Sequence, residues 1–161
     1  MIGTLVKKHN KRKHYFFLNP YKDAAFTRCP KCQGKTKLRK FPLVINVEPQ
    51  QIVILNKKCR YCTGCDLIIA KQSELERLIV ACLEDKNSVI IGNEYFTMGV
   101  LERKDWKEAN KGKIDTNETL NRMYVFKDAL DFELIPLGWH PIERLQQLIK
   151  THRGWPLSID Y

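Results

Sequence analysis

The sequence predicts an α+β fold in which residues 1–72 form a basic arm and a cysteine-flanked β-hairpin, and residues 73–161 form a small mixed α/β domain. Two β-branched runs separated by a short turn are typical of a hairpin. Five of the six cysteines fall on the two sides of these runs. An apolar stripe with helical spacing follows them. We expect the two parts to pack as one unit, because no Gly-, Pro- or Ser-rich linker separates them.

Composition restricts the class of protein. The chain has 161 residues, of which 43% are hydrophobic and 29% charged, as in a globular protein. No apolar run approaches the roughly 20 residues of a membrane helix, and the start lacks the apolar core of a secretory signal. We therefore expect a cytoplasmic protein without membrane contact. Walker-type loops, dinucleotide fingerprints and nucleophile elbows are absent, so nothing indicates an enzyme or a small-molecule substrate.

The hairpin is the central predicted element. Residues 43–47 and 52–55 are both rich in β-branched side chains, and Pro49 lies in the turn between them. Pro42 is expected to break the first arm with a bulge, because proline cannot donate a ladder hydrogen bond. The second arm leads directly to the cysteines that follow it.

Four further short strands are predicted from apolar runs. Residues 15–18 and 67–69 flank the hairpin on its two sides. Residues 89–91 and 95–98 lie further along, around a tight turn at Gly92. We expect the last two to form a small hairpin in the C-terminal part.

Helices are predicted from capping residues and apolar periodicity. Ser73 and Glu76 form a capping box at the start of the first helix. Asp115 is expected to cap a helix over residues 116–130, and a last helix is expected over residues 141–154. The apolar stripe of the first helix consists of Leu75, Leu78, Ile79, Cys82 and Leu83.

The cysteine spacing predicts a metal site. Cys29 and Cys32 form one C-x₂-C pair, and Cys59, Cys62 and Cys65 offer two overlapping pairs. Two such pairs joined by a hairpin are typical of a zinc ribbon, with one structural Zn²⁺ in a closed four-thiolate site. The chain from the hairpin turn to Cys62 is longer than the chain from the turn to Cys59. It therefore matches the first arm, from Cys32 to the turn, more closely, and this favours Cys62 and Cys65 as the partners of Cys29 and Cys32. Cys59 remains the alternative ligand.

These motifs resemble those of a known group of proteins. Cys29-Pro30-x-Cys32, residues 43–45, Pro49, residues 56–70 and residues 99–106 together resemble an uncharacterised bacterial zinc-ribbon family. The cysteine-bearing part distantly resembles the zinc ribbon of MqsA-type antitoxins, which serves structure and partner binding. The resemblance implies bound zinc and a bacterial cytoplasmic setting, and it assigns no activity.

Positive charge is concentrated in the first part of the chain. Residues 1–65 hold 15 Lys and Arg against two acidic residues, whereas residues 66–161 hold 13 against 16. Such asymmetry indicates contact with a polyanion, and we predict a nucleic-acid-binding module for RNA or DNA. Alternating positions place Lys35, Lys37 and Arg39 on one strand face. The full set of candidate nucleic-acid contacts is Lys31, Lys35, Lys37, Arg39, Lys40, Lys57 and Lys58.

The alternative is a protein-interaction or scaffold module without nucleic acid. In that case the lysines form a solvated strand edge that discourages aggregation. Three tryptophans either anchor the C-terminal core or supply a partner surface: Trp106, Trp139 and Trp155. His14, in the basic arm, is expected to be solvated.

Overall fold

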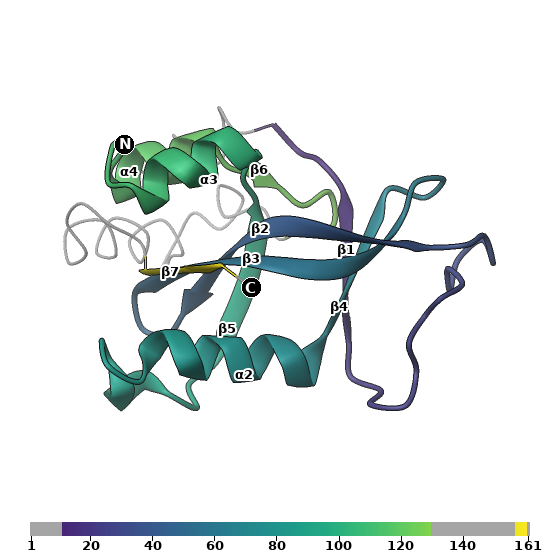
Figure 1. Cartoon of the computed structure of the whole chain (residues 1–161), viewed down its shortest axis with the longest axis horizontal. Helices are drawn as coiled ribbons and strands as arrows, with labels where there is room; N and C mark the ends of the chain where they lie inside the picture. Colours follow the sequence, from purple (N-terminus) through teal and green to yellow (C-terminus); the bar gives the residue numbers. More distant parts are fainter. Residues whose placement is uncertain (1–10, 130–156, 161) are drawn as a thin grey trace, which may run out of the picture.

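The computed structural model describes residues 11–129 and 157–160, which form a curled β-sheet with helices on both faces (Figure 1). Among these residues are seven strands, three α-helices and one 3₁₀ helix. The mixed α/β class is confirmed. The last predicted helix, residues 141–154, lies outside the described residues.

The elements follow one another closely along the chain. The strands are β1 (Tyr15–Asn19), β2 (Lys37–Val47), β3 (Gln51–Cys62), β4 (Leu67–Lys71), β5 (Tyr95–Val100), β6 (Tyr124–Val125) and β7 (Leu157–Asp160). The helices are α2 (Gln72–Leu83), the 3₁₀ helix η1 (Ser88–Ile90), α3 (Arg103–Asn110) and α4 (Thr116–Arg122). The sheet order is β1-β4-β3-β2-β5-β6, and β7 pairs with β3. Only the pairs β1–β4 and β3–β7 among these are parallel.

The predicted hairpin is confirmed and is longer than expected. β2 pairs with β3 along its whole length in an unbroken antiparallel register. The bulge expected at Pro42 is wrong, because Pro42 pairs directly with Asn56. Its carbonyl accepts a hydrogen bond from the Leu101 amide, on the side of β2 away from β3. The proline nitrogen points to that same side, so its lack of an N–H removes no hydrogen bond from the β2–β3 ladder. The register shift lies instead between Val44 and Ile45, on the side paired with β5.

Both faces of the hairpin are covered, and this explains its continuous apolar runs. Figure 1 shows α2 on one face and α3 with α4 on the other. Leu43, Ile45 and Val47 belong to the core on the α2 side. Val44 belongs to the second core, which contains Trp106 of α3 and Leu120 of α4. Alternate residues of one strand therefore enter two different cores.

The start of α2 differs from the prediction. Ser73 is not the N-cap, since the helix begins at Gln72 directly after β4. Lys71 occupies the N-cap position and makes no side-chain capping hydrogen bond. Glu76 accepts hydrogen bonds from the side chains of Gln72 and Tyr95 instead, at 2.9 and 2.8 Å. The apolar stripe is confirmed, with Leu75, Leu78, Ile79 and Leu83 buried.

The C-terminal part was predicted less well. The strand expected at residues 89–91 is wrong, since η1 lies there and Val89 is 88% exposed. The Asp115 cap is confirmed, because its side chain accepts from the Glu118 amide at 2.8 Å. The helix expected over residues 116–130 is too long, since the chain leaves α4 to pair as β6 with β5. α3 was not predicted.

Candidate metal centre and basic surface

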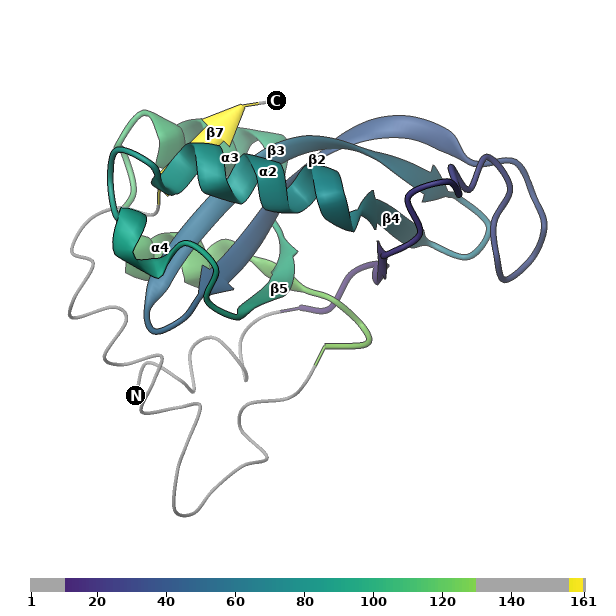
Figure 2. The same cartoon turned by 90° about the horizontal axis from the view of Figure 1, so that it is seen from below.

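Four cysteines from two distant turns meet at one end of the sheet. Cys29 and Cys32 lie on the loop between β1 and β2, Cys62 ends β3, and Cys65 lies in the turn before β4. The hairpin register sets Lys37 opposite Tyr61 and so carries the first loop to the end of β3. Figures 1 and 2 show both loops beyond the ends of the helices.

The sulfur positions suit a tetrahedral ion. Sγ of Cys29 lies 3.8 Å from Sγ of Cys65, and Sγ of Cys32 lies 3.6 Å from Sγ of Cys62. All four sulfurs lie within 4.8 Å of one another. A tetrahedral Zn²⁺ with Zn–S bonds of about 2.3 Å sets its sulfurs about 3.8 Å apart. A disulfide requires about 2.05 Å, and the four cysteines are free.

Backbone amides point at three of the sulfurs. Each of these hydrogen bonds stabilises a thiolate, because the N–H dipole favours negative charge on sulfur. They come from the turn that follows each cysteine, as expected when a C-x₂-C pair wraps around an ion. The donors and acceptors are Lys31 N to Cys29 Sγ at 3.3 Å, Gly34 N to Cys32 Sγ at 3.4 Å and Cys65 N to Cys62 Sγ at 3.4 Å.

The thiols do not ionise alike. Burial raises the pKa of Cys29, but the amides of Cys32 and Lys31 outweigh it and lower the pKa to about 7. The neighbouring thiol of Cys32 and burial raise the pKa of Cys65 to about 12. A divalent cation would have to displace protons from the cluster, so metal binding would be coupled to proton release.

The turns have matching backbone geometry. Gln33 and Asp66 each follow the second cysteine of a pair, and both adopt positive φ, 65° and 55°. Aspartate tolerates this left-handed region better than most residues. At Gly34 an added Cβ would lie 3.3 Å from Sγ of Cys32, so a larger residue would press on that sulfur.

Cys59 is not part of this cluster. Its side chain is 2% exposed and packs in the core on the α2 side. Its thiol donates to the Lys57 carbonyl at 3.4 Å, and burial raises its pKa to about 12. Cys59 occupies a position inside β3, three residues before the knuckle, which explains why the spacing alone left it as an alternative.

Six of the seven candidate nucleic-acid contacts are exposed. Lys57 is the exception, since its side chain is 2% exposed and donates to Glu74 at 2.8 Å and to the Lys58 carbonyl at 2.9 Å. Its assignment to a binding face is wrong, because a buried paired ammonium cannot reach a phosphate. The exposed residues, called the basic surface below, are Lys31, Lys35, Lys37, Arg39, Lys40 and Lys58. They occupy both faces of the hairpin end, because Lys37 and Arg39 alternate with Lys40 along β2.

His14 is buried, not solvated as predicted. It is 5% exposed, and its ring makes edge contacts with Phe41 and Tyr61. Its Nδ1 bonds to the Asp66 carboxylate, which also accepts from the Tyr61 hydroxyl at 2.7 Å and Lys127 at 3.2 Å. Burial raises the pKa of Asp66, but these donors outweigh it and hold it at about 2. The local sequence carries no signal for this group, because His14 and Lys127 lie far from Asp66 in the chain.

Trp106 is 6% exposed and belongs to the core beside α3 and α4. It therefore anchors the fold and leaves no partner surface of its own. Trp139 and Trp155 lie outside the described residues.

Comparison of the chain with protein-family models, curated proteins and solved structures finds no match. Within the described residues, no helix has the length and apolar character needed to cross a membrane.

Proposed function

We propose that this chain is a structural zinc protein of the zinc-ribbon type that binds RNA or DNA through the basic surface. Cys29, Cys32, Cys62 and Cys65 would hold one Zn²⁺. Four thiolates complete the tetrahedron and leave no open position for water or substrate, so the ion would act in structure rather than in catalysis.

The role of the ion follows from how little else holds this end of the sheet. Among the described residues, the small core there has two buried apolar side chains beside Cys29 and Cys62, those of Leu67 and Ile69, and the partly buried rings of Tyr15, Phe17 and Phe26 pack against it. Most residues between Pro20 and Thr36 are exposed. In such a loop the free energy of metal binding becomes free energy of folding.

Nucleic-acid binding is supported above all by like charges that the fold brings together on one exposed strand pair. Lys40 and Lys58 lie directly opposite each other in the β2–β3 register, and both are exposed. Like charges at opposed positions destabilise a strand pair, and a bound anion would relieve that repulsion. In residues 11–129, no carboxylate forms an ion pair with Lys35, Lys37 or Lys58.

A salt series tests this function. Fluorescence anisotropy of labelled single- and double-stranded RNA and DNA is measured with the full-length, zinc-loaded protein. We expect affinity to fall steeply as salt rises, because phosphate contacts release counterions. The double variant Lys35→Ala/Lys37→Ala removes two phosphate contacts and should reduce the logarithmic salt slope by about 1.4 on single strands.

The matched control is Lys107→Ala/Lys111→Ala, which removes the same charge from exposed positions on and just after α3. It should leave the salt slope unchanged. No binding at low salt, or equal losses in the two double variants, would contradict the proposal; the first result would favour the role in protein interaction.

A further inference from the structure

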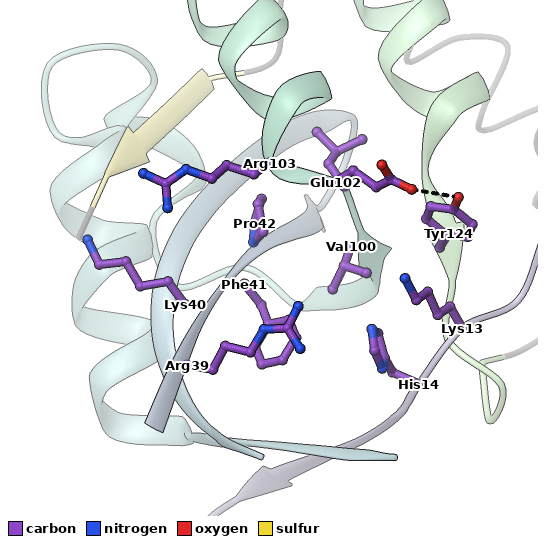
Figure 3. Close-up of a pocket in the computed structure, with 11 residues that line it drawn as sticks. Lys13, His14, Arg39, Lys40, Phe41, Pro42, Val100, Glu102, Arg103 and Tyr124 are labelled. Atoms are coloured by element: carbon purple, nitrogen blue, oxygen red, sulfur yellow. Dashed lines mark hydrogen bonds between the residues drawn. The ribbon is translucent and has the colours of Figure 1, made fainter. Parts of the chain in front are cut away.

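A cleft opens at the edge of β2, next to the basic surface. Its volume is about 560 Å³, within the range of ligand sites. Among the described residues, β5 pairs with β2 only from Leu43 onward, and no other strand pairs with β2 on this side before that point. Figure 3 shows the cleft between this edge, the segment before β1 and the start of α3. Among the residues that line it are Lys13, His14, Arg39, Lys40, Arg103 and Tyr124.

The charge of the cleft is strongly positive. Lys13, Arg39, Lys40 and Arg103 come from three separate segments and surround the opening (Figure 3). Glu102 supplies the one carboxylate among the lining residues, and it accepts the Tyr124 hydroxyl at 2.8 Å. Within residues 11–129, neither Lys13 nor Arg103 has an ion-pair partner. Cations gathered around one cavity in this way favour an anionic ligand.

The start of α3 adds to this field. Glu102 is the N-cap residue of α3 and makes no side-chain capping hydrogen bond. The amides of the first helical turn carry partial positive charge, and Glu102 and Arg103 both line the cleft. The Glu102 carboxylate offsets part of this charge, so the side-chain cations remain the main source.

The walls of the cleft also offer aromatic and apolar surface. Phe41, Pro42, Val100 and Leu101 line it beside the ring of Tyr124. The cleft therefore has room for more than a phosphate ion, and a ring system can lie against its apolar wall.

His14 presents a fixed imidazole to the same cavity. Its Nδ1 is held by Asp66, and its ring is fixed between Phe41 and Tyr61. Its Nε2 makes no hydrogen bond to any residue in the described ranges, so this atom is available for a polar contact with a ligand.

We propose that the cleft binds a nucleoside phosphate, with the phosphate at Lys13, Arg39 and Arg103 and the nucleoside against the wall that carries Tyr124. The nucleoside phosphate is either one unit of a single RNA or DNA strand or a free nucleotide. The first source rests on the proposed function. Duplex phosphates lie on the outside of a helix and fit the open basic surface better than an enclosing cleft.

The test is a titration of the full-length, zinc-loaded protein with adenosine 5′-monophosphate, followed by ¹H–¹⁵N NMR. We expect saturable shifts of the amides of Val100, Leu101 and Arg103. Adenosine without phosphate should bind at least about tenfold more weakly, because the charge-assisted contacts are lost. Inorganic phosphate should shift the same amides and bind more weakly than the nucleotide.

Two double variants of equal charge separate the cleft from the surface. Lys13→Ala/Arg103→Ala should weaken nucleotide binding at least about tenfold. Lys35→Ala/Lys37→Ala should leave it within about twofold, since neither lysine lines the cleft. The four side chains are exposed, so both variants should fold.

The results distinguish the two proposals. If single strands bind with a salt dependence while the nucleotide leaves the cleft amides unmoved, the cleft proposal is overturned and the proposed function stands. If the nucleotide binds the cleft while no strand binds the protein, the proposed function falls and the free nucleotide is the ligand. Equal effects of the two double variants on nucleotide binding would also overturn the cleft proposal.

Discussion

At the scale of single residues, Lys57 shows how the fold treats a charge that the sequence pattern assigns to the surface. It lies on β3, where Asn56 and Cys59 are also buried, and its ammonium reaches Glu74 on α2. The contact ties the hairpin to the helix that covers it. A buried cation without such a partner would be strongly destabilising.

We predict that Glu74→Gln destabilises the protein by about 1–2 kcal/mol at neutral pH, because Lys57 loses its counter-charge. The loss is smaller than for a fully buried pair, since the Glu74 side chain is 45% exposed. Urea unfolding of the wild type and the variant measures it. Glu84→Gln, at an exposed position just after α2, is the control and should stay within about 0.5 kcal/mol.

The same pair should depend on pH in a defined direction. The hydrogen bond from Lys57 lowers the pKa of Glu74 below its ordinary value of 4.5. The stabilisation is therefore complete above pH 4.5 and is lost as the pH falls through the lowered pKa. The difference in unfolding free energy between wild type and Glu74→Gln should shrink on acidification. A difference that stays constant or grows would contradict this assignment.

At the scale of elements, Gly99 shows a close approach that shapes the sheet. It lies near the end of β5, opposite Val125 of β6 and just past the register shift with β2. A Cβ at this position would lie 2.1 Å from the Tyr124 carbonyl oxygen. Only glycine lets the two backbones pack at this distance.

We predict that Gly99→Ala destabilises the protein by about 3 kcal/mol, because β6 must move away from β5. Chemical unfolding measures the loss. Gly64→Ala is the control, since its Cβ would lie 4.0 Å from the Cys62 sulfur in ordinary contact. A loss below about 1 kcal/mol for Gly99→Ala would show that β6 adapts without cost.

Some elements could be predicted from the sequence because their signals are local. The hairpin, β1 and β4 follow from β-branched and aromatic runs, and α2 follows from its apolar stripe. α3 has only Trp106 and Ala109 as buried apolar residues, too few to show a period. The prediction that Ser73 caps α2 is wrong because β4 leads directly into the helix, so Lys71 occupies the N-cap position. In both cases the tertiary contacts determine the helix, and the local sequence signal does not.

The candidate sites also differ in whether a local sequence signal predicts them. The cysteine cluster could be foreseen because C-x₂-C pairs carry their geometry in their spacing. The group of His14, Asp66 and Tyr61 could not be foreseen, since the two ends of the His14–Asp66 contact are 52 residues apart. The cleft likewise depends on three segments that only the folded sheet brings together.

At the scale of the whole molecule, one sheet joins the parts of the chain. β5 and β6, from the C-terminal part, extend the hairpin on the β2 side. The helices cover the middle of the sheet, and the loops that carry the four cysteines extend beyond them (Figure 2). The basic surface and the cleft share Arg39 and Lys40 of β2.

The proposed metal would hold together the end of the sheet where the four cysteines meet. We predict that purified full-length protein contains one Zn²⁺ per chain, which Cys65→Ser loses and Cys59→Ala retains. Zinc content by mass spectrometry, with thermal unfolding in the presence and absence of a strong chelator, measures this directly. We expect stoichiometric zinc and a lower melting temperature in chelator. Protein that carries no zinc and melts unchanged in chelator would contradict this expectation.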